Sequence, residues 1–234
     1  MNIYAWRVSE MLEGRRYEQL CTLVTKERLE RSGRFLREID TCRSLMGEAM
    51  IRLVAAADLN LSLSSIRFQL GEYGKPEISG SNSYRFNLSH SGDWVVLFTT
   101  KDGSRIGIDV EQIGDMLWQV AESVLTDREL SDLRGHAAEQ QPAYFYRLWT
   151  MKESYIKALG TGLSMPLKQF SILRTADGFA GRGAGAENFS FQAYELDDSH
   201  KLSACSEGAL PSCWQLFDLQ QFLTMNQLQH GGRA

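Results

Sequence analysis

A short segment with two acidic residues, Gly107-Ile108-Asp109-Val110-Glu111, places the strongest constraint on how this chain folds. It predicts a strand over 106–111, and alternate residues of a strand share a face, so Asp109 and Glu111 point the same way. Two carboxylates on one half-buried face repel each other unless a cation lies between them. A hard divalent ion, Mg²⁺ above all, meets that requirement. The alternative is a solvated edge strand, where Asp-X-Glu is common.

A second segment, residues 149–158, predicts part of a helix over 142–159. Its apolar residues recur at spacings of three and four: Phe145, Leu148, Trp149, Ile156 and Leu159. Glu153 and Lys157 lie one turn apart, and spacing alone favours a surface ion pair of about 0.3–0.5 kcal/mol. Lys152 falls within the apolar arc, so its ammonium either reaches the rim or neutralises an anion in a cleft.

A third segment, residues 85–97, contains the dipeptide Ser89-His90 and follows Gly74-Lys75-Pro76. Adjacent strand side chains point to opposite faces, so Ser89 and His90 do not form a nucleophile and base pair. The chain also lacks a Gly-X-Ser-X-Gly elbow. His90, which precedes a Ser-Gly turn, is suited to donating a hydrogen bond to an anion such as phosphate. A structural histidine is the alternative.

Taken in this order, the segments resemble the surfactin-type 4′-phosphopantetheinyl transferase family. The runs that carry the resemblance are residues 74–76, 86–91, 107–111 and 149–157. The spacing is similar to that of the family from the first residues to about residue 175, and no marker position departs from the family pattern.

The resemblance implies transfer of 4′-phosphopantetheine from coenzyme A to a serine hydroxyl of an acyl or peptidyl carrier protein, with release of adenosine 3′,5′-bisphosphate. By position, Asp109, Glu111 and Glu153 would hold Mg²⁺ against the pyrophosphate, which suits the charge that develops on a leaving phosphate. Glu153 would also take the serine proton, directly or through water. Lys157 would stabilise or protonate the leaving group, and His90 is the third candidate catalytic residue.

Coenzyme contacts are implied at several basic positions. Six basic residues between 26 and 43 predict, by themselves, a solvated helix face. The resemblance places Arg28 and Arg31 near the 3′-phosphate, and Arg43 with Ser44 at the nucleotide, where guanidinium forks suit phosphate. The other implied contacts are Lys75 and Pro76 at the adenine and ribose end, and Ser89, His90 and Lys157 at the phosphates.

The composition limits the class of protein. A chain of 234 residues with 43% hydrophobic content can bury one large core or two modest ones. Its net charge of −4 argues against nucleic-acid binding. The four cysteines include no Cys-X-X-Cys pair, which predicts reduced thiols. With no signal peptide or long apolar run, we expect a cytoplasmic protein that does not bind membranes. We also expect a monomer.

The predicted elements form an α+β protein. Helices are expected at 40–57, 116–124, 126–135 and 142–159, and strands at 2–8, 66–70, 84–89, 94–99, 106–111, 168–173, 188–196 and 201–206. The resemblance implies two similar, pseudo-symmetric α+β subdomains, residues 1–104 and 105–234, with the active site in the cleft between them.

Some alternatives stay open. Residues 116–120 hold a dense apolar group that is either core or a docking surface for the carrier protein. A non-catalytic carrier- or nucleotide-binding module and a Mg²⁺-dependent pyrophosphohydrolase are the rival functions. The surfactin-type pattern points to carriers of nonribosomal peptide or polyketide synthesis and to acceptance of acyl-coenzyme A analogues.

Overall fold

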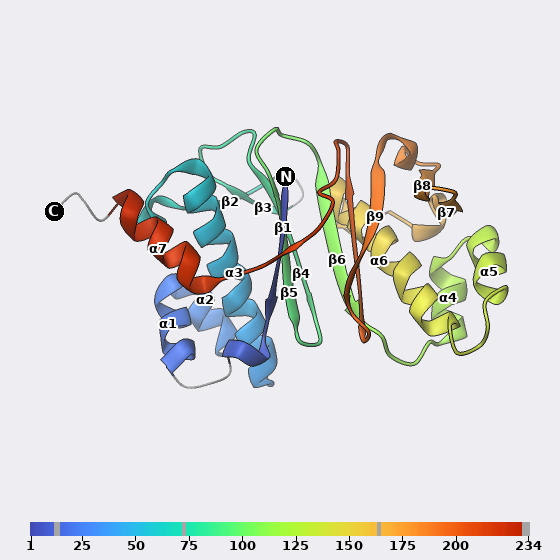
Figure 1. Cartoon of the computed structure of the whole chain (residues 1–234), viewed down its shortest axis with the longest axis horizontal. Helices are drawn as coiled ribbons and strands as arrows, with labels where there is room; N and C mark the ends of the chain where they lie inside the picture. The colour runs from blue at the N-terminus through green and yellow to red at the C-terminus, as the bar shows by residue number, and fades with distance from the viewer. Residues whose placement is uncertain (12–14, 72–73, 163–164, 231–234) are drawn as a thin grey trace.

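The computed structural model describes residues 1–11, 15–71, 74–162 and 165–230, and the predicted α+β class is confirmed (Figure 1). The helices are α1 (Arg15–Leu23), α2 (Lys26–Ser32), α3 (Glu38–Leu59), α4 (Trp118–Val124), α5 (Asp127–Arg134), α6 (Gln141–Leu159) and α7 (Leu219–His230). The strands are β1 (Asn2–Arg7), β2 (Phe68–Leu70), β3 (Pro76–Ile78), β4 (Arg85–Ser91), β5 (Trp94–Thr100), β6 (Ile106–Gln112), β7 (Ser171–Thr175), β8 (Gly178–Arg182), β9 (Ser190–Asp197), β10 (His200–Ser206) and β11 (Gln215–Leu216).

The N-terminal half is built around α3, which packs on a sheet with the strand order β11-β1-β5-β4. The sequence predicts one buried face for this helix, but nearly every side chain between Leu45 and Ala56 is buried. The reason is that α1, α2 and α7 also pack against α3. The helix is therefore the centre of the first core.

The C-terminal half repeats the same plan with other elements. Its long helix, α6, packs on a five-stranded sheet with the order β6-β10-β9-β8-β7. Gly107 in β6 permits a very close approach, since a Cβ atom there would lie 1.8 Å from the backbone oxygen of Ser154 in α6. The motif glycine thus brings the polar residues of α6 next to the carboxylates of β6.

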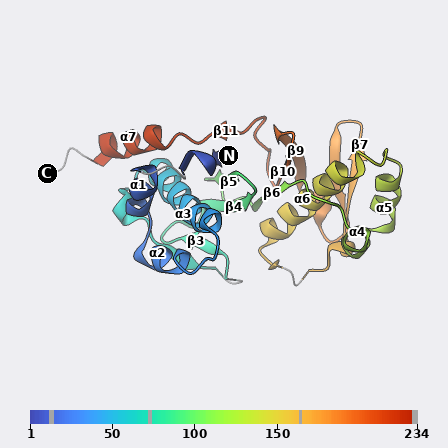
Figure 2. The same ribbon diagram turned by 90° about the horizontal axis from the view of Figure 1, so that it is seen from below.

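The two halves meet where β4 of one sheet runs beside β6 of the other (Figures 1 and 2). These strands belong to different sheets, and side chains join them. The Asn87 side-chain oxygen accepts a hydrogen bond from the Ile108 backbone N–H at 2.8 Å. This junction aligns the serines of β4 with the acidic residues of β6.

The end of the chain returns to the first half, which the sequence analysis did not predict. β11 pairs in parallel with β1, and α7 packs against α3. Figure 1 shows this red segment crossing back to the blue and cyan helices. The predicted second subdomain, 105–234, therefore contributes its last elements to the other half of the molecule.

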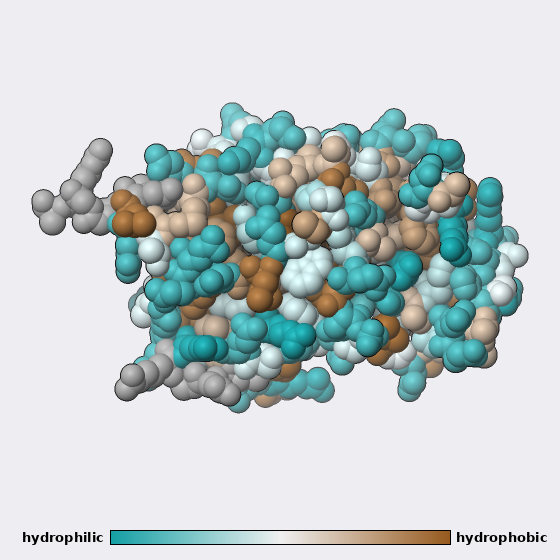
Figure 3. Space-filling model, viewed as in Figure 1, coloured by the Kyte–Doolittle hydropathy of each residue, from teal (hydrophilic) through white to brown (hydrophobic). Residues whose placement is uncertain are grey.

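Polar side chains cover most of the face shown in Figure 3, with small, separate apolar areas between them. Among the described residues, no helix is both long enough and apolar enough to span a lipid bilayer.

Candidate active site

The carboxylates of β6 lie on one face, as predicted, and each one accepts a hydrogen bond from a serine of β4. Ser89 Oγ donates to Asp109 Oδ1 at 2.8 Å, and Ser91 Oγ donates to Glu111 Oε2 at 2.8 Å. Asp109 is only 3% exposed, whereas Glu111 is half-buried. The sequence carries a signal for this pairing, since both strands place polar residues at every second position. The sequence analysis did not use that signal.

Lys157 of α6 completes the contact between the halves. Its Nζ donates to Asp109 Oδ1 at 2.5 Å and to Ser89 Oγ at 2.8 Å. The surface ion pair between Lys157 and Glu153 that spacing alone favoured is therefore wrong. Lys157 faces the cleft because the close packing of α6 on β6 turns this side of the helix towards Asp109.

The third predicted acidic residue, Glu153, is half-buried one helical turn from Lys157 and belongs to the same electrostatic cluster. Burial and the neighbouring charge of Asp109 raise the pKa of both Glu111 and Glu153 above the ordinary carboxyl value. Burial also raises the pKa of Asp109, although Lys157 and Ser89 oppose that shift. Without a further cation, these carboxyls hold protons more tightly than free carboxyls do.

The fit to a metal ion can be judged from the ligand atoms themselves. Within the described ranges, no group of three or more His, Cys, Asp and Glu side chains stands ready to hold a metal ion. Lys157 occupies one oxygen of Asp109, but the other oxygen, Oδ2, is buried and makes no hydrogen bond within the described part of the chain. An all-oxygen set with a free buried oxygen fits the chemistry of Mg²⁺.

Lys152 has a different partner from those the sequence analysis considered. Its Nζ is fully buried and lies 2.9 Å from Glu129 Oε2, and it also donates to the backbone oxygens of Leu167 and Phe170. It therefore neither reaches the rim nor faces a cleft. It neutralises a carboxylate inside the C-terminal core, and the sequence analysis missed Glu129 because the two residues are far apart along the chain.

The two predicted 3′-phosphate residues differ in their surroundings. The Nε of Arg28 donates to Glu48 Oε2 at 2.8 Å, and its guanidinium also reaches Ser44 Oγ. Arg31 is exposed, and its side chain makes no hydrogen bond or ion pair inside the described ranges. Arg28 is therefore anchored to a buried acid, while Arg31 is free to meet an anion.

Arg43 and His90 lie near the tip of the β4–β5 hairpin. The Nε of Arg43 donates to the Gly92 backbone oxygen at 3.0 Å, and its Nη1 donates to Asp40 Oδ1 at 2.8 Å. His90 has an exposed side chain, and desolvation together with the cations Arg43 and Lys157 lowers its pKa. Both residues come from the N-terminal half, which also contributes Ser89.

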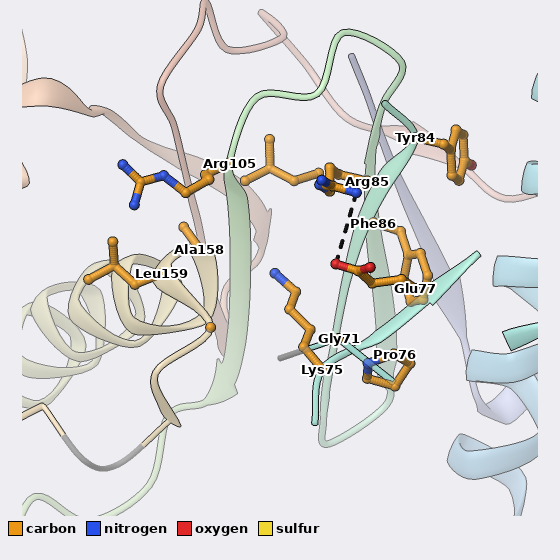
Figure 4. A pocket seen from close by; sticks show the side chains of 12 residues that line it. Gly71, Lys75, Pro76, Glu77, Tyr84, Arg85, Phe86, Arg105, Ala158 and Leu159 are labelled. Carbon is orange, nitrogen blue, oxygen red and sulfur yellow. Dashed lines mark ion pairs between the residues drawn. The ribbon is translucent and has the colours of Figure 1, made fainter. Parts of the chain in front are cut away.

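Lys75 crosses the junction between the two halves, from the N-terminal half to α6. From the hairpin of β2 and β3, its Nζ donates to the Lys157 backbone oxygen at 2.8 Å, which satisfies a carbonyl near the C-terminus of α6. Burial lowers the pKa of Lys75 to about 8. The side chain points into a cavity of about 190 Å³ between the halves, which Pro76 also lines (Figure 4). Lys75 and Gly160 also line a second pocket, of about 340 Å³, which contains Glu153 and Lys157.

The apolar group at 116–120 is largely on the surface. Leu117 is 62% exposed, Trp118 is 37% exposed and Val120 is 38% exposed, whereas Met116 packs partly against the C-terminal core. The Arg134 guanidinium lies 5.5 Å from the Trp118 ring centre. The core alternative therefore holds for Met116 alone.

Comparison with known proteins gives matches along most of the chain. The family described as 4′-phosphopantetheinyl transferase superfamily matches residues 105–219, and the one described as 4′-phosphopantetheinyl transferase, N-terminal, matches residues 6–102. A 4′-phosphopantetheinyl transferase of Bacillus subtilis is 36% identical over 208 residues, covering 88% of this chain and 92% of the relative. The transferase psf-1 of Bacillus pumilus is 37% identical over 191 residues, covering 81% of each protein.

Among solved structures, a holo-(acyl-carrier-protein) synthase of Bacillus anthracis is 20% identical, with a TM-score of 0.39 over 43% of this chain and 92% of the other. The resemblance indicated by the sequence motifs is thus confirmed by relatives that match this chain over most of its length.

Proposed function

The chain belongs to the 4′-phosphopantetheinyl transferase superfamily, and we propose that the cleft between its halves carries out this transfer with Mg²⁺. The donor is coenzyme A, and the acceptor is a serine hydroxyl of an acyl or peptidyl carrier protein. The observation that carries the proposal is the state of Asp109: one oxygen is held by Lys157 and Ser89, and the other is buried without a hydrogen bond among the described residues.

Asp109, Glu111 and Glu153 are the residues that would hold Mg²⁺. When bound, this ion would neutralise charge on the pyrophosphate, as a divalent ion does in other phosphoryl transfers. Serines 89 and 91 orient the β6 carboxylates. Groups that orient metal-binding residues in this way tune both their geometry and their affinity.

The remaining residues of the cleft act on the substrate. Glu153 accepts the proton of the carrier serine, directly or through water, as a general base. The serine oxygen then bonds to the phosphorus next to pantetheine, and the anhydride bond to adenosine 3′,5′-bisphosphate breaks. Lys157 stands where its ammonium can stabilise or protonate that leaving group.

The coenzyme contacts are assigned by charge and position. Arg28 and Arg31 meet the 3′-phosphate, Arg43 with Ser44 meets the nucleotide, and Ser89 with His90 meets the pyrophosphate. Lys75 and Pro76 lie at the adenine and ribose end, beside the cavity of Figure 4. Guanidinium and ammonium groups on several sides of one cleft suit a ligand that carries several phosphates.

The exposed patch Leu117-Trp118 is proposed to dock the carrier protein. It follows β6 directly, so an acceptor held there would present its serine close to Asp109 and Glu111. Exposed aromatic residues of this kind dominate the energy of protein interfaces. From the resemblance we also propose a monomer in the cytoplasm that serves nonribosomal peptide or polyketide carriers.

Mass spectrometry of an apo-carrier incubated with coenzyme A, with and without Mg²⁺, tests the function. The carrier should gain one phosphopantetheine on its serine only when Mg²⁺ is present. Bisphosphate release without carrier modification would instead identify a pyrophosphohydrolase, and no reaction would identify a binding module. A carrier with its serine changed to alanine is the control.

A further inference from the structure

The tip of the β4–β5 hairpin rests on a pair of polar residues from the other half of the molecule. Asp197 ends β9 and His200 begins β10, and the Nδ1 atom of His200 lies 2.9 Å from Asp197 Oδ1. The Trp94 indole N–H, from the hairpin, donates to Asp197 Oδ2 at 2.7 Å. Figure 1 shows the two hairpin tips side by side at the lower edge of the molecule.

His200 is held in one orientation and presents its second nitrogen to the hairpin. Nδ1 lies within hydrogen-bond distance of both Asp197 Oδ1 and the Ser199 hydroxyl oxygen, at 2.9 Å from each, and these contacts fix the ring. Nε2 is buried and has no hydrogen-bond partner in the described ranges. A Cβ atom built on Gly92 would lie 2.1 Å from this nitrogen, so only glycine fits between the imidazole and the hairpin backbone.

Gly92 links this contact to the coenzyme side of the cleft. Its backbone oxygen accepts hydrogen bonds from the Nε and a terminal nitrogen of Arg43, which comes from α3. His90 lies two positions before Gly92 on the same hairpin. A shift of the hairpin tip would therefore move the Arg43 guanidinium and the His90 imidazole together.

We propose that Asp197 and His200 are positioning residues for the coenzyme site: they fix the Gly92 turn and, through its carbonyl, the guanidinium of Arg43. This inference rests on the proposed function, since that function assigns Arg43 to the coenzyme nucleotide and His90 to its pyrophosphate. Neither Asp197 nor His200 touches the coenzyme in this scheme. Their effect is on where the phosphate-binding groups stand before coenzyme A arrives.

Calorimetric titration with coenzyme A, in the absence of any carrier, measures this effect directly. His200→Ala should weaken coenzyme A binding about tenfold, which corresponds to the loss of one well-placed polar contact. Asp197→Asn, which keeps the size of the side chain, should weaken it in the same direction. His136→Ala is the matched control, because His136 stacks on Tyr144 of α6, outside the contact between Asp197, His200 and the hairpin, and the coenzyme affinity of this variant should be that of the wild type.

A double-mutant cycle separates positioning from general loss of structure. Gly92→Ala should weaken coenzyme binding strongly in the wild-type background and much less in the His200→Ala background, where the closer clash is removed. The other short contact, with Gln112 Oε1 at 2.9 Å, involves the end of a flexible side chain. The φ of +52° at residue 92 is common to both backgrounds, so its strain cancels. Equal losses in both backgrounds, or wild-type affinity in His200→Ala, would overturn the inference. Failure of the wild type to modify a carrier would overturn the proposed function instead.

Discussion

Helix α6 carries two lysine–carboxylate pairs only five residues apart, and they differ in what they leave unsatisfied. In the pair Lys152–Glu129, the ammonium donates to two backbone oxygens besides the carboxylate, and both oxygens of Glu129 accept backbone N–H groups. In the pair Lys157–Asp109, the lysine is partly exposed and one buried carboxylate oxygen has no hydrogen bond within the described residues.

The difference supports the proposal that one pair is structural and the other functional. A buried pair whose hydrogen-bonding capacity is filled can only hold elements together, here α5 and α6. In the Lys157–Asp109 pair, Asp109 Oδ2 has no hydrogen bond among the described residues, and Glu111, Glu153 and a pocket lie beside it. This oxygen can therefore contact a ligand. The Lys152 and Lys157 side chains have the same chemistry, so the surroundings assign their roles.

The largest contrast should come from removing each ammonium in turn. Lys152→Met leaves Glu129 buried and uncompensated, and should lower the free energy of unfolding by about 3–5 kcal/mol. Lys157→Met also leaves a buried carboxylate, Asp109, but this lysine is partly exposed and Ser89 still donates to Asp109, so the stability loss should be smaller than that of Lys152→Met. The same substitution should slow transfer by about 10²-fold. Urea unfolding and a carrier-modification assay measure the two effects. Equal stability losses would remove the distinction between the pairs.

Arg28 and Arg31, which we propose to contact coenzyme A, differ in the same way: one has a buried carboxylate partner and the other has none among the described residues. Arg31→Ala and Arg28→Ala should each raise the KM for coenzyme A, since one charge-assisted contact is worth about 1.5–3 kcal/mol. Only Arg28→Ala should also destabilise the fold, because Glu48 would lose its partner. Dephospho-coenzyme A, which lacks the 3′-phosphate, is the control substrate. Equal KM increases for both substrates in both variants would show that neither arginine contacts the 3′-phosphate.

Lys75 provides a test by pH. Folding lowers its pKa to about 8, so the unfolded chain binds more protons above that pH, and stability from this residue rises from pH 8 towards the ordinary lysine pKa. The KM for coenzyme A should rise a few-fold above pH 8 as the ammonium is lost. Lys75→Arg stays charged and should abolish this rise. A KM profile identical in the two proteins would show that the Lys75 charge does not meet the coenzyme.

Trp118 should have the smallest effect on the fold. Because its side chain is substantially exposed, Trp118→Ala should change the free energy of unfolding by less than about 1 kcal/mol. The KM for the carrier should rise while that for coenzyme A stays constant. A large fall in melting temperature with an unchanged carrier KM would assign Trp118 to the core.

Local patterns predicted the parts of the site that depend on one element. The alternation in β6 placed Asp109 and Glu111 on one face, and the helical period placed Lys152 away from the solvent side of α6. What the sequence did not predict depends on contacts between distant segments. Glu129 beside Lys152, His200 beneath Gly92 and the return of α7 to α3 arise only when separate elements pack, and leave no local periodicity.

Binding of Mg²⁺ itself, measured by calorimetry in the presence of coenzyme A, is the most direct test of the difference between the two pairs. The wild type should bind one ion, and Asp109→Asn and Glu111→Gln should each lose that binding while remaining folded. Glu129→Gln is the matched control from the Lys152–Glu129 pair. It should lower stability, and its folded fraction should bind Mg²⁺ as the wild type does. Undiminished Mg²⁺ binding in Asp109→Asn would contradict the assignment of Asp109, in the Lys157–Asp109 pair, to the metal site.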